Sequence, residues 1–115
     1  MNSWEEAVAF ACSLPAVIME KLWGSPSPKI NGKGFMSLGR EAGSFALMVT
    51  KPEKEILFET DPETFWQTDH YRNYPMLLVR YGTPAHERVE LYIQRAWWHR
   101  AKQPQRVAAG LPERP

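Results

Sequence analysis

Residues 29–38 read KINGKGFMSL, and this stretch decides the fold. At its centre, Asn31 and Gly32 both tolerate the positive φ angles of a type I′ turn, the usual connection in a two-residue β-hairpin. Lys29 and Ile30 on one side, and residues 33–38 on the other, have the composition of short strands. The stretch therefore predicts two antiparallel strands joined by a tight turn.

Further strand patterns follow this hairpin along the chain. A second turn is expected over residues 39–43, and an apolar strand over residues 44–49. Residues 65–68 and 76–81 read as two more strands. The latter contains the run MLLV, and a continuous apolar run is typical of a strand buried on both faces. We therefore expect residues 76–81 at the centre of the sheet.

Three helices are expected, because helix start and stop signals surround three amphipathic stretches. They are a helix capped by Ser3 and Glu6 that stops at Pro15, a helix capped by Thr50 and Glu53 that reaches about Glu59, and a helix opened by Thr83 and Pro84 that ends at Gln103-Pro104. The core stripe of the last helix is Val89, Ile93, Ala96 and Trp97.

The remaining segments are less regular. Residues 16–22 read as an extended arm or a partial strand, and residues 23–28, WGSPSP, read as a loop rich in Gly, Pro and Ser. Residues 105–115 read as a C-terminal tail. The length suits one domain, which we place at residues 1–104.

The composition is that of a globular domain. Of 115 residues, 43% are apolar and 23% are charged, and there are five Trp, which excludes wholesale disorder. No apolar run approaches the roughly 18 residues that a membrane span needs. The N-terminus lacks a basic start, so we expect no signal peptide. A single cysteine, Cys12, cannot form an internal disulfide, and we expect a cytoplasmic protein that is a monomer or a weak dimer.

Charge is balanced over the whole chain but not along it. Residues 1–62 hold six Lys/Arg and eight Asp/Glu, whereas residues 63–115 hold eight and five. The strongly basic field typical of a nucleic-acid-binding protein is therefore absent. Residues 94–106 nevertheless contain four cations and no acid. This segment is either a local basic patch or a solvated helix end, where cations suit the helix dipole.

Candidate catalytic and metal-binding groups are few. Cys12 lies among small apolar residues of the first helix, with no neighbouring base in sequence, so we expect it to be a buried small hydrophobe. His70, His86 and His99 share no metal-ligand spacing. We therefore expect neither an enzyme nor a bound metal or cofactor.

Two clusters combine aromatic and polar side chains between expected strands. The first is WGSPS at residues 23–27, and the second is TDHYRNYP at residues 68–75. Binding groups often lie on loops that rigid strands hold in place. The alternative is structural: Trp23 and Tyr74 cap the core, while Asp69 and Arg72 stabilise a turn.

An ordered set of motifs resembles the MmcQ/YjbR family from about residue 5 to residue 109. The set comprises Leu14-Pro15, residues 23–27, Lys29, residues 31–33, Phe35, residues 61–65, residues 68–72, Pro75, residues 78–80 and Ala96-Trp97. Two positions depart from the family pattern: Pro28 replaces an aromatic residue, which could shorten or bulge its strand, and Tyr81 stands where Leu is usual. The resemblance implies a CyaY-like α+β fold, a two-layer structure in which an antiparallel five-stranded sheet has helices packed on one side. The implied order is helix, three strands, helix, two strands, helix.

Two functions from different classes remain open. The family is often labelled DNA-binding, so the resemblance implies a protein that binds double-stranded DNA through its cations, with exposed Trp98 and His99 beside them. The candidate phosphate contacts are Lys29, Lys33, Arg72, Arg80, Arg95, Arg100 and Lys102. The alternative is a module that binds a protein or a small ligand through the aromatic-polar loops. Its candidate residues are Trp23, Ser25, Ser27, Trp66, His70, Tyr71 and Tyr74.

Overall fold

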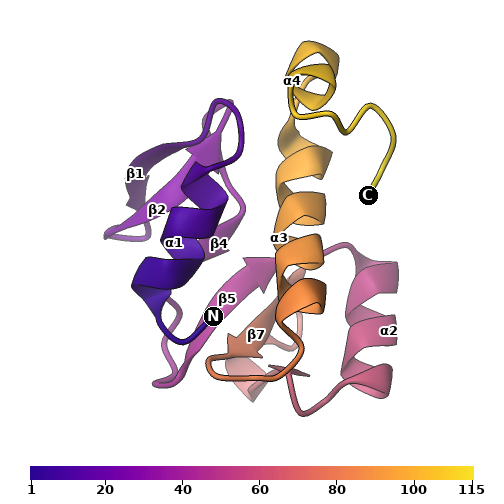
Figure 1. Cartoon of the computed structure of the whole chain (residues 1–115). Coiled ribbons are helices and arrows are strands. Elements are labelled where there is room, and N and C mark those ends of the chain that lie inside the picture. Colours follow the sequence, from indigo (N-terminus) through magenta and orange to yellow (C-terminus); the bar gives the residue numbers. More distant parts are fainter.

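A four-stranded antiparallel sheet in the order β4-β5-β7-β6 forms the middle of the protein, and a three-stranded sheet in the order β1-β2-β3 lies beside it (Figure 1). This arrangement comes from a computed structural model that describes all of residues 1–115. The elements in chain order are α1 (Trp4–Cys12), β1 (Ile18–Leu22), β2 (Ser25–Ile30), β3 (Lys33–Gly34), β4 (Met36–Ser37), β5 (Ser44–Met48), α2 (Lys51–Thr60), β6 (Phe65–Trp66), the 3-10 helix η1 (Asp69–Tyr71), β7 (Met76–Arg80), α3 (His86–Arg100) and α4 (Gln103–Ala108). The expected α+β class with antiparallel strands is confirmed, but the strands divide between two sheets and do not form one five-stranded sheet.

The four-stranded sheet buries both of its faces, and the two faces have different cover. Side chains alternate across a strand, so Phe45 and Leu47 of β5 join the main core beneath α1 and α3, together with Leu77 and Val79 of β7. The intervening residues Ala46, Met76 and Leu78 belong to a smaller apolar cluster with Tyr71. The helices therefore cover one face, and the segment around η1 covers the other. As expected, β7 lies inside the sheet, between β5 and β6.

Two prolines explain why the strands divide into two sheets. Pro26 and Pro28 lie on β2 and face Lys21 and Met19 of β1 in an antiparallel register. Leu22 and Ser25 flank the two-residue turn and form a hydrogen-bonded pair, and such pairs alternate along the strands. Ser25, Ser27 and Lys29 of β2 therefore hydrogen-bond to β1. Pro26 and Pro28 lie between them, so their ring nitrogens face the edge of β2 away from β1. A proline has no N–H to donate, so β2 cannot build a regular ladder towards β4 on that edge.

Both short hairpins turn through a residue pair with left-handed backbone. Asn31 (φ 54°) and Gly32 (φ 78°) join β2 to β3, which confirms the predicted turn. Trp23 (φ 53°) and Gly24 (φ 85°) join β1 to β2 in the same way. The interpretation of residues 23–28 as a loop is therefore wrong: only Trp23 and Gly24 turn, and the rest is strand.

The C-terminal part is more ordered than the sequence suggests. Helix α3 ends at Arg100, and Pro104 then lies in the first turn of α4, where a missing N–H costs nothing. The segment after α4 returns along α3, where Trp98 Nε1 donates to the Leu111 carbonyl over 2.9 Å. The interpretation of residues 105–115 as a tail is thus wrong for residues 105–108, and Trp98 is half-buried rather than exposed.

The start of α3 also differs from the prediction. Thr83 was expected to cap it, but the helix begins at His86, after Ala85. Thr83 is buried, and its hydroxyl lies 2.7 Å from that of Thr64 and also accepts from the Ala85 N–H. The hydroxyl pair, rather than the helix, therefore determines where Thr83 lies.

Candidate functional site

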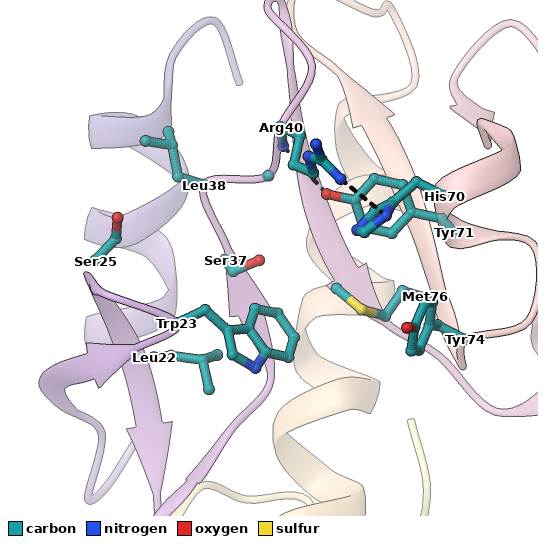
Figure 2. A pocket seen from close by; sticks show the side chains of 11 residues that line it. Leu22, Trp23, Ser25, Ser37, Leu38, Arg40, His70, Tyr71, Tyr74 and Met76 are labelled. Atoms are coloured by element: carbon teal, nitrogen blue, oxygen red, sulfur yellow. Dashed lines mark hydrogen bonds between the residues drawn. The ribbon is translucent and has the colours of Figure 1, made fainter.

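A cavity of about 460 Å³ opens between the turn of the β1-β2 hairpin and the helix-free face of the four-stranded sheet (Figure 2). Eleven residues line it: Leu22, Trp23, Ser25, Ser37, Leu38, Gly39, Arg40, His70, Tyr71, Tyr74 and Met76. They come from three separate parts of the chain, residues 22–25, 37–40 and 70–76. The split between the sheets thus leaves a space that aromatic, hydroxyl and cationic side chains share.

The hairpin side of the cavity is formed by Trp23, whose side chain is 69% exposed. A left-handed backbone costs an ordinary L-residue about 1–2 kcal/mol, and Asn and Gly are the types that tolerate it. Asn31 occupies the matching position in the neighbouring turn. Trp23 therefore adopts an unfavourable backbone conformation without burying its large ring.

The opposite side is formed by Arg40, His70 and Tyr71. The Arg40 backbone N–H donates to the Tyr71 hydroxyl over 3.1 Å, and Arg40 Nη1 lies 3.0 Å from His70 Nδ1 (Figure 2). A guanidinium can only donate, so Nδ1 must accept, and the neutral ring then carries its proton on Nε2. The imidazole also packs edge-on against Tyr71, with ring centroids 4.8 Å apart. These contacts hold a guanidinium and an imidazole N–H at one end of the cavity.

The floor of the cavity belongs to the four-stranded sheet. Ser37 pairs with Ala46, and Ala46 with Leu78, so Ser37 lies in the cross-strand row on the helix-free face. Ser37 is only 5% exposed, and its hydroxyl forms no hydrogen bond with another lining side chain in Figure 2. A buried hydroxyl beside a cavity is available to a ligand.

Gly39 allows the chain to pass close to Tyr71. Its φ of +81° is left-handed, and a Cβ at this position would lie 3.4 Å from the Ala46 nitrogen and 3.7 Å from the Tyr71 hydroxyl. A side chain here would be strained by the backbone angle and would crowd both groups. Gly39 therefore permits the turn that brings Arg40 to the cavity.

Lys54 of α2 supports the loop that carries His70, Tyr71 and Tyr74. Its Nζ donates to the carbonyl oxygens of Tyr71, Arg72 and Tyr74 over 2.9, 3.1 and 2.7 Å. Partial burial lowers the pKa of this ammonium. Three carbonyl acceptors satisfy all three of its donors, so Lys54 fixes the position of the loop. Sequence spacing does not predict this role, because the contact joins distant segments.

The structure brings together most of the candidate ligand-binding residues. Trp23, Ser25, His70, Tyr71 and Tyr74 all line the cavity. Ser27 and Trp66 do not: the Ser27 hydroxyl donates to the Ser25 carbonyl, and Trp66 Nε1 donates to the Ser44 hydroxyl. Sequence reasoning missed Leu22, Ser37, Leu38, Gly39, Arg40 and Met76. The only signal for residues 37–40 was a turn directly after a strand.

The candidate phosphate contacts are divided between different parts of the surface. Arg72 pairs with Asp69, while the Arg80 guanidinium lies 4.4 Å from the centre of the Trp66 ring. Arg95 Nε donates to buried Glu53 over 2.5 Å. The guanidinium of half-buried Arg100 donates to the Ala96 carbonyl, and burial lowers its pKa. All four arginines thus have partners within the fold; Arg72 and Arg80 remain exposed, whereas Arg95 and Arg100 are half-buried.

Three lysines of the same set lie nearer to one another. Asn31 Nδ2 donates to the Arg100 carbonyl over 2.8 Å, which places the hairpin that carries Lys29 and Lys33 next to the junction of α3 and α4. Lys102 lies at that junction. Lys29, Lys33, Arg100 and Lys102 thus come from adjacent segments, although the Arg100 side chain is half-buried.

A second group of titratable side chains lies between α2 and α3, away from the cavity. Burial alone raises the pKa of Glu53, but hydrogen bonds from Thr50 and Arg95 outweigh it and bring that pKa below its ordinary value. His99 Nε2 is buried without a hydrogen-bond partner, 3.9 Å from Glu53 Oε2. Burial lowers the pKa of His99, although the Glu53 charge opposes the shift. This cluster ties the two helices together, and none of its residues lines the cavity between the sheets.

Cys12 and Tyr81 are two further titratable residues that belong to no catalytic arrangement. The expectation that Cys12 is buried is wrong, because its side chain is exposed. Desolvation by the nearby chain still raises the pKa of its thiol, which disfavours the reactive thiolate. Burial and the charge of Glu5 raise the pKa of Tyr81 to about 12, and its hydroxyl has no partner.

Comparison with known proteins gives no family assignment: no family model, no curated protein and no solved structure matches the chain. The resemblance to the MmcQ/YjbR family stays a prediction. No helix has both the length and the apolar character required to cross a membrane.

Proposed function

We propose that the protein is a binding module for a small ligand and that its site is the cavity between the two sheets. One observation carries the proposal: the two aromatic-polar loops around Trp23 and His70, about 45 residues apart in sequence, converge on one cavity. Its volume of about 460 Å³ lies within the range of small-molecule sites.

The lining of the cavity favours a ligand with a flat apolar part. Trp23 and Tyr74 offer exposed rings, and Leu22, Leu38 and Met76 add aliphatic and thioether surface. Aromatic side chains provide large contact areas at little cost in conformational entropy, and they are enriched at binding sites. The polar groups are few, which suits orientation of a mostly apolar ligand.

The conformation of Trp23 supports a role in binding rather than in stability. Unfavourable backbone angles cluster at functional sites, where the surrounding structure maintains them. A ring that is 69% exposed contributes little to the core. We infer that Trp23 is kept in this turn because its ring covers a bound ligand.

The proposal is for binding without catalysis. Within the cavity, the His70 Nδ1 that would act as a base accepts from Arg40 instead of from a serine hydroxyl. The hydrogen bonds between lining residues join Arg40 to Tyr71 and to His70, and neither bond joins a base to a nucleophile.

Double-stranded DNA is the second proposal, and it has less support. Lys29, Lys33 and Lys102 come from adjacent segments, and three phosphate contacts imply weak binding with a salt slope of only about −2.7. Four of the seven candidate cations have other partners within the fold.

Calorimetric titration with indole-3-acetamide, a neutral planar probe, tests the ligand proposal. We expect saturable binding, and a loss of affinity of about tenfold or more in Trp23→Asn, since truncation of a central aromatic contact has effects of this size. Phe58→Ala is the control, because Phe58 is an exposed aromatic residue on α2 that does not line the cavity. Equal loss in both variants, or no binding by the natural protein of either this probe or its carboxylate analogue, would contradict the proposal.

A further inference from the structure

We propose that the ligand of the cavity is a small aromatic carboxylate, whose anionic group binds Arg40 and the Nε2–H of His70 while its ring packs between Trp23 and Tyr74. This inference rests on the proposed function and names the chemical class of the ligand. It follows from the charge, the donor directions and the shape of the cavity.

The charge of the lining is one-sided. Arg40 is the only residue among the eleven with a permanent charge, and no Asp or Glu lines the cavity. Each of the four ion pairs in the protein uses other residues, so no carboxylate lies within 4 Å of the Arg40 guanidinium. An unpaired guanidinium beside an apolar cavity is suited to an anion that arrives with the ligand.

The polar groups of this end are all able to donate. The contact with His70 Nδ1 uses one guanidinium N–H and leaves the others free, and it leaves the imidazole proton on Nε2. The Tyr71 hydroxyl accepts from the Arg40 backbone and retains its own proton. A set of donors without a competing acceptor charge favours a carboxylate over an amine or a neutral amide.

Leu22 and Trp23 provide an apolar surface on the side of the cavity opposite Arg40 and His70. Tyr74 lies between the two sides: its ring packs against that of His70, with centroids 5.9 Å apart, and Met76 lies beside it (Figure 2). A ligand that satisfies both ends has a charged group separated from a flat ring by a short distance. This polarity distinguishes an aromatic carboxylate from a uniformly apolar compound.

The anion is a carboxylate rather than a phosphate, because the cationic charge is limited to one guanidinium. Phosphate sites add backbone N–H groups at a helix N-terminus or a glycine-rich loop. Here the only helix among the lining segments is η1, a single 3-10 turn. One planar guanidinium matches the two oxygens of a carboxylate.

Titration of the natural protein and two variants with a matched pair of probes tests this class. Indole-3-acetate and indole-3-acetamide have nearly the same shape and differ in charge. We expect the natural protein to bind the acid roughly tenfold to a hundredfold more tightly, the range for a hydrogen bond to a charged group. Arg40→Gln should remove this preference, because it lowers the affinity for the acid far more than the affinity for the amide.

Arg80→Gln provides the matched control. Arg80 is also an exposed arginine that contacts an aromatic ring, but it lies outside the cavity, and its removal changes the net charge by the same amount. We expect it to retain the preference for the acid. An equal loss in Arg40→Gln and Arg80→Gln would overturn the inference, because the preference would then reflect the overall charge.

The outcomes separate this inference from the proposed function. If neither probe binds any of the three proteins, the proposed function fails. If the natural protein binds both probes equally, the cavity is a ligand site but the carboxylate inference is overturned. Displacement of indole-3-acetate by inorganic phosphate at lower concentrations than by acetate would also overturn it. Binding of the amide to Arg40→Gln shows that the variant keeps a folded cavity.

Discussion

Trp97 and Trp23 lie in two regions of the protein that differ in burial and in backbone conformation. Trp97 on α3 is fully buried, and its indole N–H donates to the Pro15 carbonyl over 2.9 Å. Trp23 is 69% exposed and has a left-handed backbone at the edge of a cavity. Trp97 combines a helical backbone with complete burial, whereas Trp23 has an unfavourable backbone conformation and an exposed ring.

This difference indicates a division between stability and binding. The core holds the four-stranded sheet against α1 and α3, and it supplies the apolar burial that folding requires. The cavity lies on the other face of that sheet, where a short hairpin and a loop contribute most of the lining. Loops on a rigid scaffold commonly carry binding residues. Variants of the two regions should therefore separate stability from ligand affinity.

The largest expected effect is that of Trp97→Ala. Truncation of a fully buried Trp costs about 3–5 kcal/mol, a large share of the stability of a small domain. Urea denaturation followed by circular dichroism measures the change. A midpoint close to that of the natural protein would show that Trp97 is not part of the core.

Glu53→Gln should cost less, about 1.5–3 kcal/mol, the range for hydrogen bonds to a charged group. The carboxylate accepts from the Thr50 backbone N–H over 2.7 Å and from Arg95. Because its pKa is lowered in the folded state, its stabilising effect is lost as the pH falls below the ordinary value of 4.5. Urea midpoints between pH 3 and pH 7, about the range of carboxylate titration, test both points. Glu55→Gln on the same helix, which is exposed, should leave the pH profile unchanged.

His99→Gln should change the free energy of unfolding less, and the change should appear only in its pH dependence. The folded protein has a lowered pKa at His99, so the unfolded chain takes up the proton first, below the ordinary value of 6.5. Stability should fall as the pH is lowered from that value. The variant should remove this part of the decrease.

The charges of Arg95, Arg114 and Arg100 add to the lowering of the His99 pKa by burial, and only the charge of Glu53 opposes it. His86→Gln is the comparison variant, because exposed His86 at the start of α3 contacts the N-terminal ammonium over 3.3 Å instead of Glu53. An unchanged profile in His99→Gln would contradict the assignment.

The smallest effect on stability is expected for Trp23→Asn. An Asn-Gly pair suits a type I′ turn, so the variant should be equally stable or up to about 1 kcal/mol more stable. Its affinity for indole-3-acetamide should nevertheless fall about tenfold or more. A loss of more than about 1 kcal/mol of stability, beyond the usual range for surface substitutions, would show that Trp23 supports the fold.

Much of the fold could be predicted because local signals agreed with the final structure. The turn at Asn31-Gly32, the capping box of Thr50 and Glu53, and the inner strand at residues 76–80 are confirmed. In each case the backbone preference and the apolar pattern indicate the same element. The burial of Trp97 follows from its place in the core stripe of α3.

The errors occurred where tertiary contacts override local signals. The prolines of WGSPSP suggest a loop, yet β1 accommodates them because their ring nitrogens face away from the ladder. Half of the cavity was missed for a similar reason. Ser37 and Arg40 meet His70 only after β4 and β7 are aligned through β5, a contact that sequence spacing does not reveal.

A titration of the ¹⁵N-labelled protein with indole-3-acetate, followed by amide chemical shifts, tests the central claim most directly. The account predicts saturable shifts at residues 22–25, 37–40 and 70–76, with α1 and α3 unaffected. Shifts centred on the junction of α3 and α4, or the absence of saturable shifts around the cavity, would contradict it.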